Sequence, residues 1–109
     1  MEMGKTTVEG GKNAKHTLDA ATEAQLTGQI QALVTAPINK KAMQMADFGY
    51  PGHTEFLAEK AKTSNPLMLM INDNLRVAVA TGHIPLTEVA SKITKELITK
   101  KIRLMEKTL

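Results

Sequence analysis

The chain has 109 residues, 42% of them hydrophobic and 23% charged, and its formal net charge is +3. These values are typical of one globular domain, and no apolar run approaches the roughly 20 residues that a membrane span requires, which argues against a membrane role. Because cysteine and tryptophan are absent and only 3% of the residues are aromatic, disulfides and thiolate metal sites are excluded, and there is little surface for stacking nucleic acid bases. The N-terminus has neither an apolar signal region nor an Arg-rich amphipathic pattern, which indicates a cytoplasmic protein.

The first predicted element is a helix from Lys12 to about Thr27, in which apolar residues recur at helical spacing and which Gly28 closes. Residues 30–36, IQALVTA, follow as a short and uncharged run. Such runs are typical of a strand buried on both faces. We therefore predict a strand that ends at Pro37.

Two short helices are predicted next. Pro37 is favoured in the first turn of a helix, and the helix formers after it predict a helix over residues 38–46. After the loop DFGYPG, an apolar stripe predicts a second helix from His53 to about Lys62.

The last third of the chain predicts a hairpin and one long helix. Residues 67–71 and 75–81 are apolar runs joined by Asn, Asp and Asn, which favour a turn between antiparallel strands. From Pro85 or Thr87 to the end of the chain, apolar residues recur at spacings of three, four and seven, as in a helix. The order of elements predicts an α/β fold with a small mixed sheet and flanking helices.

Two histidines stand in glycine-containing turns at element boundaries, His53 before a helix and His83 after a strand-like run. A single histidine at a helix start more often makes structural hydrogen bonds to free backbone groups. Two such sites favour a metal, because imidazole is the commonest metal ligand. A catalytic zinc normally keeps three protein ligands, so a third ligand has to come from elsewhere. His16 lies inside the first predicted helix, and we expect it to be exposed.

The segment VTAPINKKAM is a candidate anion site. It runs from a predicted strand into a helix whose first turn carries Asn39, Lys40 and Lys41. Free N–H groups at a helix N-terminus bind anions, and a lysine there adds a full charge. The alternative is an ordinary connection with solvated lysines. The chain has no dinucleotide, hydrolase or zinc-protease signature of the GxGxxG, GxSxG or HExxH type.

Three segments taken together, ALVTAPINKKAM, YPGHTEFLAE and LRVAVATGHIPLTEVA, resemble the middle of the 4-hydroxythreonine-4-phosphate dehydrogenase family. They occur in the family's order through nearly the whole chain, and PGHTEFLAE and TGHIPL are specific to that family. The resemblance implies an isocitrate/isopropylmalate-dehydrogenase-like fold. Residues 1–109 would form a single unit, the central part of a longer dehydrogenase chain whose C-terminal NAD-binding part is absent. It also implies a homodimer with a shared active site.

The same resemblance implies a set of site residues. The family holds a divalent cation (zinc, magnesium or cobalt) on three histidines, and His53 and His83 match two of them. The third belongs to a downstream Tyr-His-Asp-Gln stretch that this sequence lacks. Asn39 and Lys40 align with contacts to the phosphorylated substrate, although family members often have histidine where Asn39 stands. The catalytic proton acceptor is not identified by this resemblance.

The implied reaction is the NAD-dependent, metal-assisted oxidation of 4-phosphooxy-threonine (4-hydroxythreonine 4-phosphate), followed by decarboxylation, in vitamin B6 biosynthesis. Because one metal ligand and the cofactor segments are missing, we expect the 109-residue chain by itself to be inactive. One alternative is a dehydrogenase of a related four-carbon acid, threonate or erythronate 4-phosphate. Another is a non-catalytic binding or dimerisation module. The expected partners are a small phosphorylated substrate and a second copy of the chain, with neither nucleic acid nor membrane.

Overall fold

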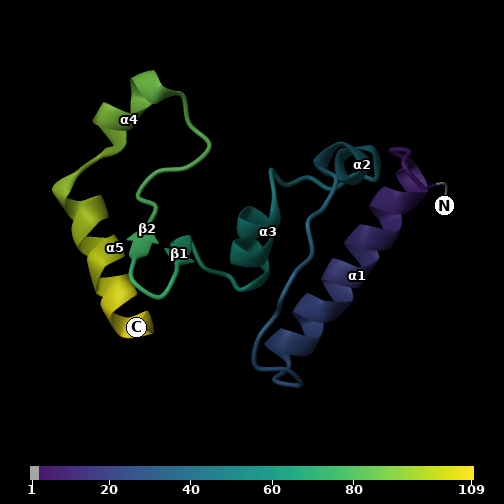
Figure 1. The fold of residues 1–109 in the computed structure, drawn as a ribbon, viewed down its shortest axis with the longest axis horizontal. Coiled ribbons are helices and arrows are strands. Elements are labelled where there is room, and N and C mark those ends of the chain that lie inside the picture. Colours follow the sequence, from purple (N-terminus) through teal and green to yellow (C-terminus); the bar gives the residue numbers. More distant parts are fainter. Residues whose placement is uncertain (1–2) are drawn as a thin grey trace. The chain divides into compact units, whose positions relative to one another are not determined.

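A computed structural model describes residues 3–109 of the chain. The chain divides into two compact units, Met1–Ser64 and Asn65–Leu109. Helices and short strands both occur, which confirms the α/β class (Figure 1). No helix in the part that the structure describes is long and apolar enough to cross a membrane. The elements are α1 (Val8–Leu26), α2 (Lys40–Met45), α3 (His53–Lys60), β1 (Leu69–Ile71), β2 (Arg76–Ala78), α4 (Leu86–Lys92) and α5 (Lys95–Thr108).

Helix α1 starts four residues before the predicted boundary at Lys12. Thr7 is its N-cap, and the Thr7 hydroxyl accepts a hydrogen bond from the Gly10 backbone N–H at 3.1 Å. A threonine in this position satisfies one of the free N–H groups of the first turn, which offsets the poor helix propensity of the two glycines that follow. The predicted end is confirmed: Gly28 adopts φ +77° directly after the C-cap.

Gly11 allows α1 to pass very close to α2. A Cβ atom on Gly11 would stand 1.9 Å from the Ala42 carbonyl oxygen and 3.0 Å from the Ala46 Cβ. Only a residue without a side chain permits that approach. Gly11, although it stands in a glycine-rich stretch, is therefore part of a helix–helix contact.

The first unit has a small apolar core between its three helices. Phe56 of α3 and Met43 of α2 are 2% and 1% exposed. The Phe48 ring packs at 5.4 Å from Phe56 and at 5.2 Å from Tyr50, measured between centroids. Burying a side chain of this size contributes about 1.5–3 kcal/mol, so these residues dominate the stability of the unit. The buried core cluster is Leu18, Met43, Phe48 and Phe56.

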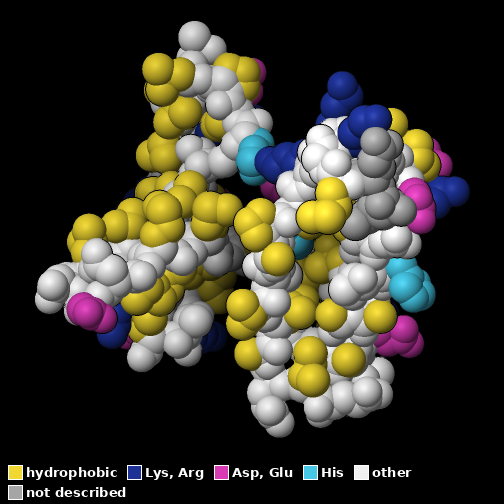
Figure 2. Space-filling model, turned by 45° about the vertical axis from the view of Figure 1, so that its right-hand side comes forward, with side chains coloured by type: hydrophobic (Ala, Val, Ile, Leu, Met, Phe, Trp, Pro, Cys, Tyr) yellow, Lys and Arg dark blue, Asp and Glu magenta, His cyan; other side chains and the backbone are white. Residues whose placement is uncertain are grey.

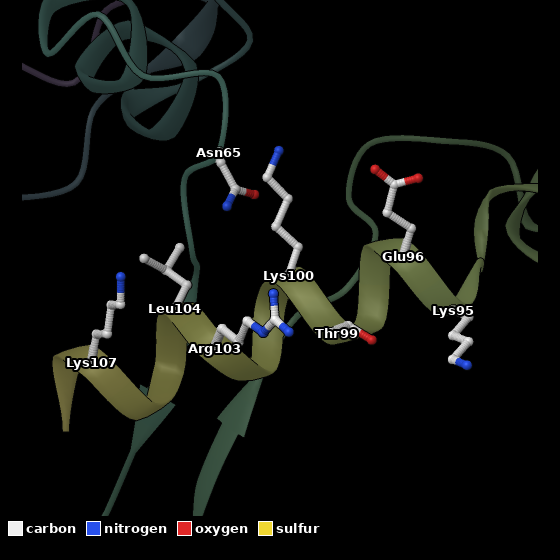
Figure 3. Close-up of a pocket in the computed structure, with 8 residues that line it drawn as sticks. All are labelled: Asn65, Lys95, Glu96, Thr99, Lys100, Arg103, Leu104 and Lys107. Atoms are coloured by element: carbon white, nitrogen blue, oxygen red, sulfur yellow. The ribbon is translucent and has the colours of Figure 1, made fainter.

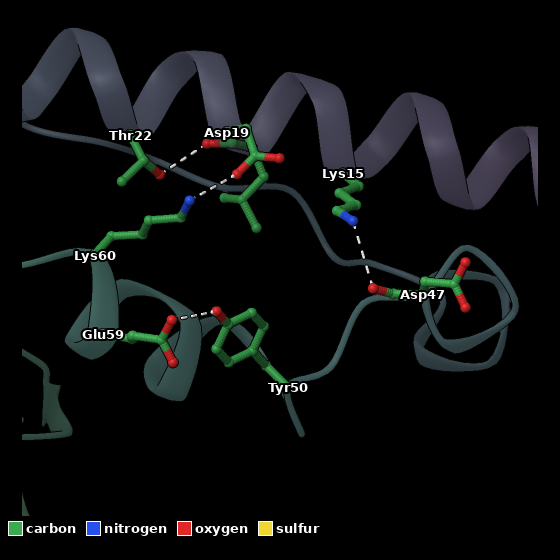
Figure 4. A network of polar contacts seen from close by, with 8 residues as sticks. Lys15, Asp19, Thr22, Asp47, Tyr50, Glu59 and Lys60 are labelled. Carbon is green, nitrogen blue, oxygen red and sulfur yellow. Dashed lines mark hydrogen bonds and ion pairs between the residues drawn. The ribbon is translucent and has the colours of Figure 1, made fainter.

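Polar contacts join the loop after α2 to helices α1 and α3 (Figure 4). Lys15 on α1 donates to the Asp47 carbonyl at 3.4 Å. The Tyr50 hydroxyl donates to Glu59 on α3 at 2.7 Å. A third contact, the ion pair between Lys60 and Asp19, joins α3 to α1 at 3.4 Å. The loop is thus held against the two helices, and it leads into the turn that carries His53.

The predicted strand over residues 30–36 is wrong. This segment has no strand partner among residues 3–109, and Figure 1 shows it as an irregular trace beside α1. Val34 in its middle is 95% exposed. A strand buried on both faces needs neighbouring strands for its backbone hydrogen bonds, and the described residues supply none. The sheet therefore contains two strands, not the predicted mixed set.

The predicted hairpin in the second unit is confirmed. Strands β1 and β2 are antiparallel, with Met70 opposite Val77. The Asn72 side-chain oxygen accepts hydrogen bonds from the backbone N–H groups of Asn74 and Leu75 at 2.9 and 2.8 Å. This is the local bonding for which asparagine is favoured in turns.

The predicted long C-terminal helix is interrupted: α4 ends at Lys92 and α5 begins at Lys95. Ile93 is extended, with ψ 105°, and Thr94 caps α5 by accepting from the Leu97 N–H at 3.1 Å. A threonine that caps a new helix competes with continuation of the old one. The apolar spacing continues across the break, which is why periodicity alone predicted one helix.

The second unit has no buried residue between Asn65 and Leu109. Its apolar side chains are half-buried or exposed; Leu86 and Ile102, for example, are 87% and 61% exposed. Figure 2 shows hydrophobic side chains reaching the surface over much of the visible face.

Candidate functional site

Asn39 is the N-cap of α2. Its side-chain oxygen accepts from the Ala42 N–H at 2.9 Å, and its amide nitrogen donates to the Thr6 hydroxyl at 3.4 Å. Pro37 therefore precedes the helix, and the predicted start at residue 38 is corrected to Lys40. The cap is favoured because asparagine satisfies an N–H group that the first turn leaves free. Both ends of the Asn39 amide thus serve the local fold.

Lys40 is exposed at the first position of α2, and its side chain reaches the turn before α3. The Lys40 ammonium nitrogen lies 3.9 Å, and a Glu55 carboxylate oxygen 3.6 Å, from the point where a Cβ on Gly52 would stand. Gly52 itself is buried. The starts of α2 and α3, which are separated by a loop in the sequence, therefore approach each other through the Lys40 side chain.

His53 is the first residue of α3 and is half-buried. It lines a cavity of about 290 Å³ together with α1 residues and residues 33–38. The preceding Gly52 makes no side-chain cap to the helix. The backbone N–H groups of a first turn and the helix dipole favour negative charge. The first turn of α3 already contains the Glu55 carboxylate, and the Lys40 ammonium lies near the same turn.

His83 lies between β2 and α4, is exposed, and has φ +56°. Two other non-glycine residues of the described chain, Asp47 and Lys62, also have positive φ. Each of those directly follows a helix C-cap, where the left-handed conformation closes the helix through hydrogen bonds such as Phe48 N–H to the Met43 carbonyl at 3.0 Å.

His83 follows a strand, so helix capping does not explain its backbone. A non-glycine residue whose backbone is held in the left-handed region costs on the order of 1 kcal/mol or more, and such residues cluster at functional sites. The conformation therefore marks His83 as a candidate ligand independently of its sequence context.

No group of three or more His, Cys, Asp or Glu side chains within residues 3–109 is placed to hold a metal ion. His53 belongs to the first unit and His83 to the second. The joint ligand role of these two histidines stays a prediction. His16 is exposed on α1, as predicted.

Sequence reasoning missed the Tyr50–Glu59 hydrogen bond and the approach of Lys40 to Gly52. The hydrogen bond has a sequence signal, because Tyr50 lies just before the turn and Glu59 lies on the helix that follows the turn. The second has none, because it depends on how α2 and α3 pack.

Comparison with known proteins gives one consistent family. The sequence matches the family described as pyridoxal phosphate biosynthetic protein PdxA over residues 1–109. It is 42% identical to a 4-hydroxythreonine-4-phosphate dehydrogenase from Bacteroides thetaiotaomicron, covering 100% of this chain and 30% of that protein. A relative of the same name from Chromobacterium violaceum is 38% identical, over 95% of this chain and 32% of its own length.

Two solved structures are similar. One is 4-hydroxythreonine-4-phosphate dehydrogenase from Klebsiella pneumoniae, with a TM-score of 0.88, 31% identity, and coverage of 98% of this chain and 32% of that one. The other is a putative 4-hydroxythreonine-4-phosphate dehydrogenase from Salmonella typhimurium, with a TM-score of 0.84, 33% identity, and coverage of 96% and 33%. The chain thus spans about a third of the length of these relatives, and it belongs to the PdxA family of pyridoxal phosphate biosynthetic proteins.

Proposed function

We propose that this chain supplies part of the active site of an NAD-dependent dehydrogenase that oxidises 4-phosphooxy-threonine, a step in making pyridoxal phosphate. The family match and the name shared by the relatives support this reaction. The observation that carries the proposal is the convergence of the Lys40 ammonium on the turn between Gly52 and His53.

The substrate phosphate binds between the starts of α2 and α3. Lys40 adds a positive charge there, and the first-turn N–H groups of α3 have no side-chain cap. Charge-assisted hydrogen bonds to phosphate oxygens are stronger than neutral ones. Asn39 contributes by fixing where α2 begins. Because its amide is already engaged, Lys40 carries more of the phosphate affinity than Asn39.

His83, together with His53, contributes to a divalent-metal site. Two imidazoles are compatible with zinc, magnesium or cobalt only with further ligands, which the described residues do not group with them. Once bound, such a cation lowers the pKa of the substrate hydroxyl and stabilises negative charge on its oxygen. His83 is the stronger candidate because helix capping does not explain its positive φ.

In this reaction the substrate carbon loses a hydride to NAD and its hydroxyl loses a proton, which gives a ketone. The ketone lies β to the carboxylate, so the product then loses carbon dioxide. Lys40 holds the phosphate end throughout and so keeps the reacting carbon in one place. We further propose that the protein is a homodimer with a shared active site. By itself, the 109-residue chain does not turn over substrate.

A related substrate, threonate or erythronate 4-phosphate, is the second candidate, because asparagine stands at position 39. Turnover separates the two in a chimera in which residues 1–109 replace the matching third of the Bacteroides thetaiotaomicron relative. Each acid is assayed with NAD and a divalent metal, and NADH is followed by absorbance. Activity with 4-phosphooxy-threonine alone supports the leading proposal, and activity with neither acid contradicts both.

Single variants of the chimera separate the histidine roles. His83→Ala is expected to raise the metal concentration needed for half-maximal activity at least tenfold. His53→Ala tests the ligand assignment directly. A rise in KM for the phosphorylated substrate, with metal dependence unchanged, moves His53 from the metal to the phosphate. Measurable NADH production by the purified 109-residue chain contradicts the expected inactivity.

A further inference from the structure

The net charge of the chain is concentrated in the second unit. Residues 1–64 carry seven Lys and Arg against seven Asp and Glu, whereas residues 65–109 carry seven against four. The excess of three positive charges therefore belongs entirely to residues 65–109. A local excess of one sign attracts oppositely charged ligands.

Helix α5 places much of this charge along one stripe. Lys100, Arg103 and Lys107 follow each other at spacings of three and four, so they share one side of the helix. The half-buried residues of α5 lie on another side; these are Leu97, Ile98, Thr99, Lys101, Leu104 and Met105. Except for Thr99 and Leu104, their mean direction is about 140° from the basic stripe. Most of the packed face is thus separated from the basic stripe, and Leu104 lies at the boundary and lines the same groove.

The basic stripe lines a groove of about 650 Å³, which lies wholly within residues 65–109 (Figure 3). Lys100 and Lys107 reach to the side of α5 on which Asn65 lies, while Lys95 points to the other side. Thr99 adds a hydroxyl to the lining, and Glu96 is the one acidic residue in it. The volume is within the range of sites that hold small molecules, roughly 300–1,000 Å³.

The cations of the stripe are not neutralised by the chain. Within residues 3–109, Lys100, Arg103 and Lys107 form neither an ion pair nor a hydrogen bond. Lys101, on the packed face, is different: it donates to the Pro66 carbonyl at 2.6 Å. One lysine of α5 thus stabilises the unit, and the three basic side chains of the stripe stand together without a structural partner.

We propose that this groove binds a small anion with two or more linked phosphates. The three basic side chains extend over about 10 Å of helix, at 1.5 Å per residue, which matches a short oligophosphate chain. Arginine can bind phosphate through two parallel hydrogen bonds, and lysine acts as a point charge. A nucleic acid strand is a poorer fit, because the three aromatic residues of the chain all precede residue 65 and no base could stack here.

This site is separate from the proposed catalytic function, since it uses none of Asn39, Lys40, His53 and His83. The experiment is isothermal titration calorimetry of the 109-residue chain with inorganic tripolyphosphate at low salt. We expect tripolyphosphate to bind at least tenfold more tightly than orthophosphate. A 12-nucleotide single strand is the third ligand, and tighter binding of this strand than of tripolyphosphate contradicts the proposal.

Variants show where the anion binds. Lys100→Gln, Arg103→Gln and Lys107→Gln combined should weaken tripolyphosphate binding at least tenfold. The matched control combines Lys12→Gln, Lys62→Gln and Lys92→Gln, which removes the same charge from exposed positions outside the groove; we expect less than a twofold change. An equal loss in both triple variants, or no heat with wild-type chain at millimolar tripolyphosphate, overturns the proposal.

Glu96→Gln provides a test that does not depend on weakening the helix. It removes the only acidic side chain of the groove lining, so we expect about twofold tighter binding. Unchanged or weaker binding, with the circular dichroism spectrum preserved, counts against a phosphate site at this position.

Discussion

The two units of the chain use apolar residues in opposite ways. In the first, Phe56, Met43 and Phe48 are at most 4% exposed and pack between α1, α2 and α3. In the second, no residue between Asn65 and Leu109 is buried, although apolar residues are frequent there. Because stability follows the apolar area removed from water, the first unit contains most of the chain's internal stabilisation.

The difference also concerns charge. The first unit balances its charges and joins its helices through contacts such as Lys60 with Asp19. The second unit carries the net charge and leaves three cations of α5 without partners in the described chain. A unit with exposed apolar side chains and unneutralised charge is suited to contacts with other molecules.

The largest predicted effect is a direct contrast between the cores. Phe56→Ala should lower the free energy of unfolding of the first unit by about 3–5 kcal/mol, as for other buried phenylalanines. Leu104→Ala, at a half-buried position of α5, should cost less than about 1.5 kcal/mol in the second unit. Amide hydrogen exchange measured residue by residue reports the two units separately. Equal losses for the two variants would contradict the contrast.

Gly11→Ala should destabilise the first unit by about 1–3 kcal/mol, because the new Cβ overlaps the Ala42 carbonyl and pushes α1 away from α2. Urea unfolding followed by tyrosine fluorescence measures this loss of stability, since Tyr50 is the only tyrosine and lies in this unit. The control is Gly49→Ala, where a Cβ meets nothing within 4 Å. A stable Gly11→Ala variant would show that α1 and α2 can separate without cost.

Asn39→Ala should cost about 1 kcal/mol through loss of the α2 cap. Asn39→Asp keeps an oxygen that can accept from the Ala42 N–H, so its stability should stay within about 0.5 kcal/mol of the wild type. Thermal unfolding followed by circular dichroism compares the three proteins. If Asn39→Ala is as stable as wild type, the residue is free for a substrate contact after all.

The smallest predicted effect is on the titration of Tyr50. Its hydrogen bond to Glu59 raises the pKa of Tyr50 above the ordinary value, and partial desolvation and the carboxylate charge act in the same direction. Because the pKa of Tyr50 is raised in the folded state, the Tyr50–Glu59 interaction stabilises the fold below about pH 10. This stabilisation is lost as pH rises through the folded pKa.

Absorbance at 295 nm should therefore give a higher tyrosine pKa in the folded chain than in urea. Glu59→Gln should bring the folded pKa closer to the unfolded value. Identical titration curves in the folded and unfolded chain would show that the hydrogen bond does not persist in solution.

Local signals predicted those parts of the fold that local bonding decides. Gly28 ends α1, and Asn72 closes the hairpin turn through its own side chain. Thr94 carries a similar signal, an N-cap residue between two apolar stretches, but the continuing periodicity hid it. For the candidate site, sequence alone indicated Asn39, Lys40, His53 and His83. It did not show that the Asn39 amide is engaged by α2 and Thr6.

Taken by itself, the sequence determined the family, the helix-forming segments after residue 37, the hairpin and the two histidine-bearing turns, because each depends on neighbouring residues along the chain. Only the tertiary structure decided that Gly10 and Gly11 belong to α1, that residues 30–36 form no strand, and that Lys40 meets the turn at Gly52. These features depend on which backbone groups and side chains find partners across space. Local propensity contains no information about such partners.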